Sequence, residues 1–125
     1  MTEKEINALK SGPDFDRAVA EALGWKGIGM ETIPGVGCPD LKALVGTSPE
    51  GRNELLPAWT LFCGASLGLL PEAVKRWWVC ELSPSPAGFL CRFTSKTGQR
   101  REAESNFLTE AVCKAFLLAH WAEKN

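Results

Sequence analysis

The sequence predicts a small α+β fold: a single domain in which a three-stranded antiparallel sheet is layered with helices, in the order α-α-β-β-β-α. The chain has 125 residues, the length of one ordinary domain. Three short segments with alternating apolar and polar residues lie between Arg76 and Glu104. Apolar residues at helical spacing come before and after them, so helices are expected on both sides of the strands in the sequence.

The composition is that of a globular protein, and it argues against some classes of function. An apolar fraction of 45% and a charged fraction of 23% are average for a globular chain. The formal net charge of -1 argues against strong binding of duplex nucleic acid, which depends on many contacts from Lys and Arg to phosphates. The longest apolar run, Leu55–Leu70, is interrupted by Pro57 and two glycines and is shorter than the ~20 residues of a membrane-spanning helix. Met1–Lys10 is polar and charged and does not have the pattern of a signal peptide, so we expect a cytoplasmic protein that does not enter membranes.

The first helix is expected from Asp14 to Leu23. Ser11 or Asp14 can cap its start, and Gly24 can end it in the left-handed conformation. Trp25 then stands where an apolar residue folds back on the last turn. Residues 1–12 are polar and charged, and we expect them to form a flexible N-terminal segment.

The next part of the chain is expected to be irregular. Residues 26–56 are rich in Gly, Pro and short polar residues, which favour turns, with one short helical turn at Asp40–Val45. A second helix is expected to begin near Pro57, which is tolerated in a first helical turn, and to run toward Leu69.

Three strands follow, at Arg76–Leu82, Phe89–Ser95 and Gln99–Glu104. Alternation assigns Cys80, Leu82 and the matching residues of the second strand to a buried face. The third strand is mostly polar, so we expect it to be an edge strand or strongly solvated. The last helix, Phe107–Glu123, is apolar nearly all round, so we expect it to be buried or to share a face with a second copy, which would give a homodimer.

The order of these pieces resembles a known family. The resemblance lies in the Asp-Arg-Ala-Val-Ala-Glu-Ala-Leu-Gly-Trp-Lys opening at Asp16–Lys26, in Pro57-Ala58-Trp59, and in the acidic strand end and alanine-rich helix of Glu102–Leu118. Together they are similar to the small bacteriophage proteins of the phage ABA sandwich domain family. The resemblance implies a layered α/β/α arrangement and a phage or prophage origin, and it brings no catalytic residues.

Residues for catalysis are few. Gly64–Gly68 matches the G-x-S-x-G elbow of serine hydrolases, but that elbow requires a buried parallel sheet for which the chain is too short. His120 lies seven residues after Cys113, about 10 Å along a helix and too far for a nucleophile and its base. Glu102 and Glu104 share one face of the third strand without a nucleophile nearby. The five cysteines are scattered without metal-binding spacing, so we expect reduced thiols, no metal and no cofactor.

The strand region carries the positive charge. Between Lys75 and Arg101 stand six basic residues and a single acid, Glu81, a formal +5. One interpretation is a sheet whose charged side chains only face water. The other is a surface for an anionic nucleotide, because an aromatic ring stacks on a base and a guanidinium binds phosphate in bidentate fashion. The candidate ligand-binding residues are Trp77, Arg92, Lys96, Arg100 and Arg101.

These observations predict a non-enzymatic phage accessory protein that works by binding in the cytoplasm of an infected bacterium. The first hypothesis is a sponge that sequesters a nucleotide immune signal on the basic sheet. The second is an inhibitor that docks on a host defence protein or nuclease, in the manner of an anti-CRISPR protein, through the apolar last helix or an exposed Trp25 or Trp59. A more remote alternative is an enzyme that processes nucleotides.

Overall fold

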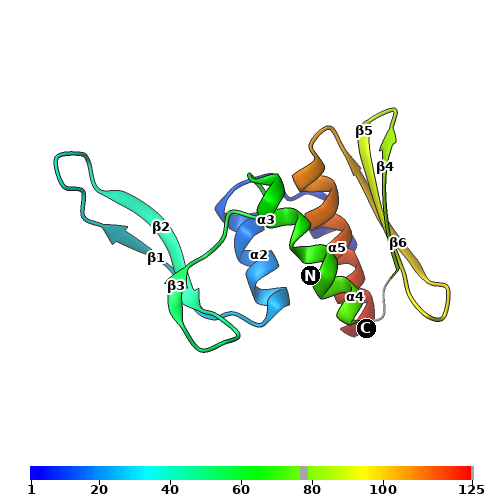
Figure 1. Cartoon of the computed structure of the whole chain (residues 1–125), viewed down its shortest axis with the longest axis horizontal. Helices are drawn as coiled ribbons and strands as arrows, with labels where there is room; N and C mark the ends of the chain where they lie inside the picture. Colours follow the sequence, from blue (N-terminus) through cyan, green and yellow to red (C-terminus); the bar gives the residue numbers. More distant parts are fainter. Residues whose placement is uncertain (77–78, 125) are drawn as a thin grey trace.

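The computed structural model describes residues 1–76 and 79–124, with side chains up to Ala122. Within them the chain has an α+β fold, as predicted, but with two three-stranded antiparallel sheets instead of one (Figure 1). The helices are α1 (Glu3–Asn7), α2 (Pro13–Leu23), α3 (Cys63–Leu67), α4 (Leu69–Lys75) and α5 (Leu108–Lys124). The strands are β1 (Lys26–Ile33), β2 (Leu41–Thr47), β3 (Asn53–Leu55), β4 (Val79–Ser85), β5 (Gly88–Thr94) and β6 (Arg100–Ser105).

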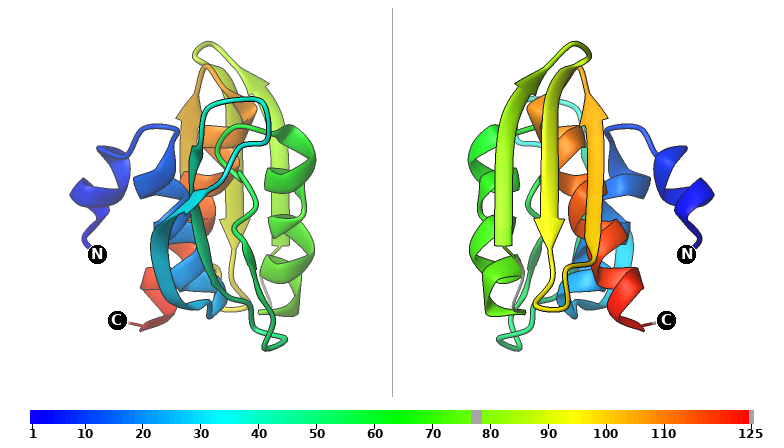
Figure 2. Two further views of the ribbon diagram at one scale, coloured as in Figure 1. Left: turned by 90° about the vertical axis from the view of Figure 1, so that its left-hand side faces the viewer. Right: turned by 90° about the vertical axis from the view of Figure 1, so that its right-hand side faces the viewer.

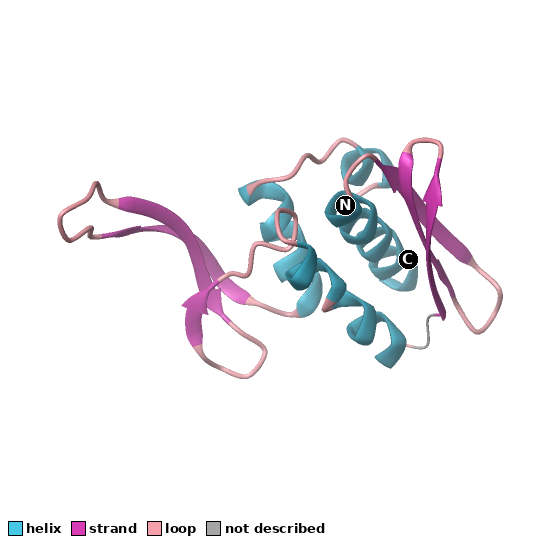
Figure 3. Ribbon diagram, turned by 45° about the horizontal axis from the view of Figure 1, so that its top comes forward, coloured by secondary structure: helices cyan, strands magenta, loops and turns pink. Residues whose placement is uncertain are grey.

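The helices form the middle of the molecule, between the two sheets. Sheet β4-β5-β6 lies against α5 and α4, and no helix of the described residues covers its other face (Figures 1 and 2). Sheet β1-β2-β3 lies on the far side of the helices, and its β1-β2 hairpin projects away from them (Figure 3). Helices thus cover one face of sheet β4-β5-β6, whereas sheet β1-β2-β3 is not packed on them as a layer, so the arrangement differs from the α/β/α order that the family resemblance implies.

The sheet predicted from the sequence is sheet β4-β5-β6. The register pairs Cys80 with Phe93 and Leu82 with Cys91, so these four side chains share one face, as expected from the alternation. Cys91 and Phe93 are completely buried, because that face packs against α5. Leu82 and Phe89, expected to be buried on the same face, are 38% and 37% exposed. The polar strand β6 is an edge strand, also as expected. Trp77 and Trp78, placed in the first predicted strand, lie outside the described residues.

Helices α2 and α5 also match their predictions closely. Gly24 ends α2 with a left-handed φ of 95°, and the Trp25 N–H donates to the Ala20 carbonyl at 3.0 Å. Trp25 is thereby folded back into the core. Helix α5 is buried on nearly every face from Ala111 to Ala119, as its all-round apolar sequence predicts.

The helix predicted from Pro57 begins six residues later, at Cys63, and it breaks into α3 and α4 at Gly68. A tertiary contact explains the late start. The Thr60 N–H donates to the Asp16 carboxylate at 2.9 Å, and the Thr60 hydroxyl accepts from the Gly12 N–H at 3.0 Å. This segment is thus held against the start of α2, and its backbone is not helical.

Residues 26–56, expected to be irregular, form sheet β1-β2-β3. Asp40–Val45, expected to be a helical turn, lies mostly in strand β2, and Leu41 pairs with Ile33 across the hairpin. The sheet contacts mainly itself. Its exposed apolar side chains are Met30, Val36, Leu41 and Leu55.

The N-terminal segment, expected to be flexible, contains helix α1. The Thr2 hydroxyl accepts from the Glu5 N–H at 3.1 Å, and the Glu5 carboxylate accepts from the Thr2 N–H at 3.3 Å. This reciprocal cap fixes the first turn, and Ile6 is buried against the core. None of the helices in the described part of the chain has both the length and the apolar character needed to span a membrane.

Candidate ligand pocket beside strand β6

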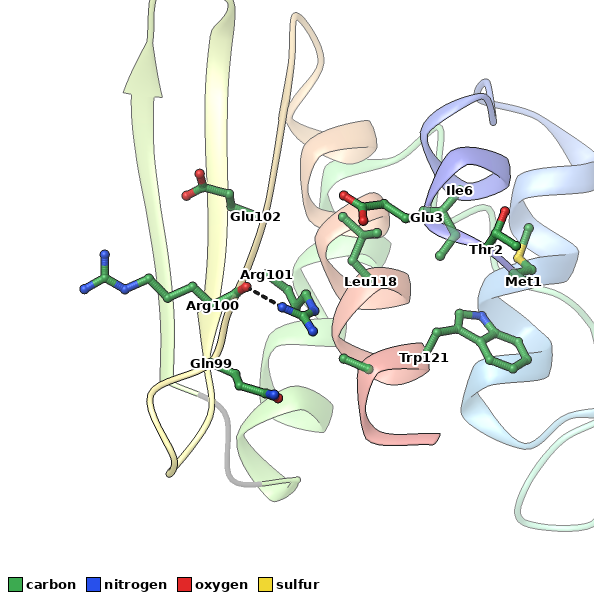
Figure 4. Close-up of a pocket in the computed structure, with 11 residues that line it drawn as sticks. Met1, Thr2, Glu3, Ile6, Gln99, Arg100, Arg101, Glu102, Leu118 and Trp121 are labelled. Carbon is green, nitrogen blue, oxygen red and sulfur yellow. Dashed lines mark hydrogen bonds between the residues drawn. The ribbon is translucent and has the colours of Figure 1, made fainter. Parts of the chain in front are cut away.

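The structure does not bring the predicted nucleotide-binding residues to one surface. Trp77 lies outside the described residues, and Lys96 lies in the exposed turn between β5 and β6. Arg92 and Arg100 point away from the helices, whereas Arg101 points toward α5; Figure 4 shows the opposite directions of the two consecutive arginines. Consecutive residues of a strand point to opposite faces of the sheet, so only one of Arg100 and Arg101 can lie on the same face as Arg92.

Arg92 is already paired with carboxylates. Its Nε lies 2.7 Å from Glu102 Oε2, and its Nη1 lies 3.9 Å from Glu81 Oε2, with both acids on neighbouring strands of the same outer face. The hydrogen bond to Glu102 is the main reason that the pKa of Arg92 is raised. A phosphate at this place would have to displace the Glu102 carboxylate. The outer face is therefore an internally paired surface, and the prediction of Arg92 as a phosphate ligand is not supported by its contacts.

A pocket of about 560 Å³ lies on the other side of β6, between this strand, helix α1 and helix α5 (Figure 4). Its size is within the range of roughly 300–1,000 Å³ typical of small-molecule sites. The residues that line it are Met1, Thr2, Glu3, Ile6, Gln99, Arg100, Arg101, Glu102, Leu118, Trp121 and Ala122.

Arg101 is the main charged group of this pocket. Its guanidinium extends from β6 toward α5, and Nη1 donates to the Arg100 carbonyl at 3.0 Å. Among the carboxylates that the structure describes, none lies within 4.0 Å of this guanidinium. A guanidinium has five N–H donors, so most of those on Arg101 remain available to an anion.

The rest of the pocket is apolar with a polar rim. Leu118 lies between Arg101 and the Trp121 indole, which is on the side of Met1 (Figure 4). Trp121 is half-buried and packs in part on the core, and the His120 ring meets it edge to face at 5.4 Å. The Glu3 carboxylate points from α1 toward β6. Of the lining residues, Arg100 and Arg101 are cationic, Glu3 and Glu102 are acidic and Trp121 is aromatic, and of the two arginines it is Arg101 that points toward α5.

Sequence reasoning placed Arg101 among the candidates but missed the elements opposite it. A signal for α1 was present, because Thr2 and Glu5 have the spacing of a capping box. Trp121 lies in the predicted last helix, Phe107–Glu123, and was not among the candidate ligand-binding residues. No local pattern brings the N-terminus beside strand β6, since that contact is made in three dimensions by packing of α1 on α5.

The other reactive groups are occupied or buried. Ser66, in the G-x-S-x-G segment, is fully buried in α3 and donates to the Cys63 carbonyl at 3.0 Å. Arg76 donates to His120 Nδ1 at 2.9 Å and to the Ala22 carbonyl at 3.1 Å. Since a guanidinium can only donate, Nδ1 of His120 accepts this bond.

The thiols of β4, β5 and α5 interact with one another. Hydrogen bonding with Cys80, followed by burial, raises the pKa of Cys91, and the same bond lowers the pKa of Cys80. Burial raises the pKa of Cys113, whose thiol donates to the Trp59 carbonyl at 3.5 Å. In residues 1–76 and 79–124, no three His, Cys, Asp or Glu side chains are grouped so that they could hold a metal ion.

Comparison with known proteins adds no functional information. No family model, curated protein or solved structure matches the chain. The resemblance to the phage ABA sandwich family therefore stays a prediction from the sequence.

Proposed function

We propose that the chain is a non-enzymatic protein that binds and sequesters a small anionic ligand, with a nucleotide as the ligand class, in the pocket between β6, α1 and α5. The observation that carries this proposal is the direction of Arg101, whose guanidinium points into the pocket without a carboxylate partner among the described residues. This modifies the sequence-based hypothesis: the ligand class is kept, and the site moves from the outer face of the sheet to the inner side of β6.

The pocket has the two chemical groups that such a ligand needs. The guanidinium of Arg101 can bind a phosphate through two parallel hydrogen bonds. The Trp121 indole, at the other end of the pocket, offers an aromatic surface to a base. Because Leu118 lies between them, the ligand must be long enough to reach both, which favours a nucleotide over inorganic phosphate.

The resemblance to phage proteins guides the choice of ligand. A phage protein with such a pocket would act in the infected bacterial cytoplasm by removing a nucleotide immune signal. No residue set beside the pocket supplies a nucleophile with its base in the described chain. Sequestration, with release of the ligand unchanged, is therefore the proposed mode of action.

The test is thermal unfolding of the protein with cyclic di- and trinucleotides and ADP-ribose derivatives. A ligand that binds only the folded state raises the midpoint, by about 2.7 kcal/mol of stability at ~100 times its dissociation constant. We expect Arg101→Gln to abolish the shift and Arg92→Gln, which lies on the outer face and does not line the pocket, to keep it. A flat panel, or an equal shift in Arg101→Gln, would refute the proposal. Chromatography of the recovered ligand distinguishes binding from turnover.

A second candidate function is docking on a host protein. The surfaces first expected to dock are buried: Trp25 and Trp59 are 9% and 6% exposed, and α5 is enclosed. The hairpin β1-β2 instead presents Val36, 98% exposed at its tip, and Leu41, 63% exposed. Exposed apolar side chains on a projecting element favour contact with another protein. Leu41→Lys should abolish capture of that partner from a bacterial lysate and leave nucleotide binding intact, and light scattering with the same variant tests whether the partner is a second copy.

A further inference from the structure

A second pocket, of about 410 Å³, lies between helices α3 and α4, the end of α2 and the turn that joins β2 to β3. It shares no lining residue with the pocket beside β6. The residues that line it are Leu23, Trp25, Pro49, Glu50, Trp59, Ala65, Gly68, Leu69, Glu72 and Lys75. Its composition differs from the first pocket, because it has two tryptophans and two carboxylates.

The tryptophans form a rigid corner. The rings of Trp25 and Trp59 are nearly perpendicular, with an interplanar angle of 85° and centroids 6.1 Å apart. Their backbones are fixed by hydrogen bonds, from the Trp25 N–H to the Ala20 carbonyl at 3.0 Å and from the Cys113 thiol to the Trp59 carbonyl at 3.5 Å. The edge of one indole therefore lies against the face of the other, and both residues line the pocket with the small part of their surface that is exposed, 9% for Trp25 and 6% for Trp59. The face of an indole attracts cations.

The charged residues of the pocket have a net negative charge. Glu72 is bonded to Lys75 at 3.1 Å, and the two side chains are 40% and 71% exposed. Glu50 lies in the β2-β3 turn, and among the described residues no basic group lies within 4.0 Å of its carboxylate. One uncompensated carboxylate beside two aromatic rings disfavours an anion and favours a cation.

We infer that this pocket binds an N-methylated ammonium group, such as the trimethylammonium of choline. The charge is attracted by the indole faces and by Glu50, and the methyl groups suit the apolar side formed by Leu23, Ala65 and Leu69. Ala65 has a small side chain, which leaves room for a branched group at the helices. This inference does not depend on the nucleotide proposal.

The experiment is a titration of the ¹⁵N-labelled protein with choline, followed through the indole N–H signals of Trp25 and Trp59. The matched comparison is 3,3-dimethylbutan-1-ol, which has the same shape without the charge. We expect choline to shift both signals in a saturable way and the neutral alcohol to bind at least about fivefold more weakly, in line with cation–π energies near 1 kcal/mol.

Two exposed residues test the role of charge without risk to the fold. Glu50→Gln should weaken choline binding about five- to tenfold. Glu54→Gln, on β3 outside the pocket, is the matched control and should leave binding unchanged. Lys75→Met removes a positive charge from the rim and should strengthen binding. Equal binding of the neutral alcohol would show that the pocket recognises only an apolar shape. Unchanged indole signals would show that the pocket does not bind choline. Either result would overturn the inference.

Discussion

The two sheets of this chain have the same number of strands and the same antiparallel order, but their surroundings differ. Sheet β4-β5-β6 packs one face on α5, where Cys91 and Phe93 are completely buried. Sheet β1-β2-β3 has no comparable helix layer, and Leu41 and Leu55 are 63% and 53% exposed. Strand pairing alone therefore does not bury apolar surface. A sheet is stabilised by what covers it, and the second sheet is therefore expected to be the weaker part of the fold.

The largest effect should come from deleting one large side chain in each sheet. Phe93→Ala leaves a cavity under β5, and we expect it to lower the free energy of unfolding by about 3–5 kcal/mol. Leu41→Ala should lower it by no more than about 0.5 kcal/mol, because the side chain is mostly in water already. Urea denaturation measures both. A loss of about 2 kcal/mol or more in Leu41→Ala would mean that another molecule covers the hairpin.

Glycine substitutions sharpen the same contrast. Gly88, at the start of β5, has φ +126°, and a Cβ there would lie 2.7 Å from the Ser105 carbonyl oxygen. Gly88→Ala should cost about 2 kcal/mol of global stability. Gly35 is equally tight, since its Cβ would lie 2.2 Å from the Cys38 carbonyl oxygen. Because Gly35 lies at the hairpin tip, Gly35→Ala should change the tip locally, seen as faster amide exchange in Ile33 and Leu41, with the same global unfolding midpoint.

The Glu110 carboxylate joins helix α5 to the N-terminal segment and to strand β6. Glu110, on α5, accepts from the Ser11 hydroxyl at 2.8 Å, from the Ser11 N–H at 3.1 Å and from the Ser105 hydroxyl at 3.1 Å. Burial alone would raise the pKa of Glu110, but these bonds and the charge of Lys114 outweigh burial, so the pKa is lower than its ordinary 4.5. The ionised form is therefore favoured in the folded state.

Glu110→Gln should lower stability by about 1 kcal/mol at pH 7. Because the folded-state pKa is depressed, the contribution of Glu110 is complete above about pH 4.5 and is lost as the pH falls through the folded-state value. The difference in stability between wild type and Glu110→Gln should therefore disappear in acid.

The pKa of Asp16 is shifted in the opposite direction, since burial raises it above 3.8 despite the hydrogen bond from Thr60. Asp16→Asn keeps an acceptor for that bond and should not lose stability at pH 7; a large loss there would contradict the assigned cost of burial.

The difference between the sheets also explains what the sequence could predict. Burial of one face imposes alternation, so Cys91 and Phe93 identified β5 correctly. With little of either face buried, β1 and β2 have no such alternation, and their Gly and Pro residues indicated turns. The flanking segments Met30–Ile33 and Leu41–Val45 around a Gly/Pro-rich loop were the available hairpin signal.

The errors at the candidate site have a different physical cause. Arg101 was selected from the sequence because of its charge, but its pocket depends on α1 lying beside α5, which is a tertiary contact. The predicted helix from Pro57 failed for the same reason, because the Thr60 N–H bonds to Asp16 and not to the preceding turn. Local patterns predict elements, whereas long-range contacts decide where elements begin and which side chains meet.

The smallest effect is expected on the outer faces, where both sheets meet water. Arg92 links three strands through Glu81 and Glu102, yet exposed ion pairs contribute little to stability, since water already solvates the separate charges. Arg92→Gln should leave the unfolding midpoint unchanged within error, as should its matched control Lys42→Gln, an exposed residue of β2. Nucleotide-induced shifts should also persist in Arg92→Gln and disappear in Arg101→Gln. Loss of the shift in Arg92→Gln alone would contradict the proposed pocket and would place the ligand on the outer face. A phosphate bound there would have to replace the Glu102 carboxylate as the partner of Arg92.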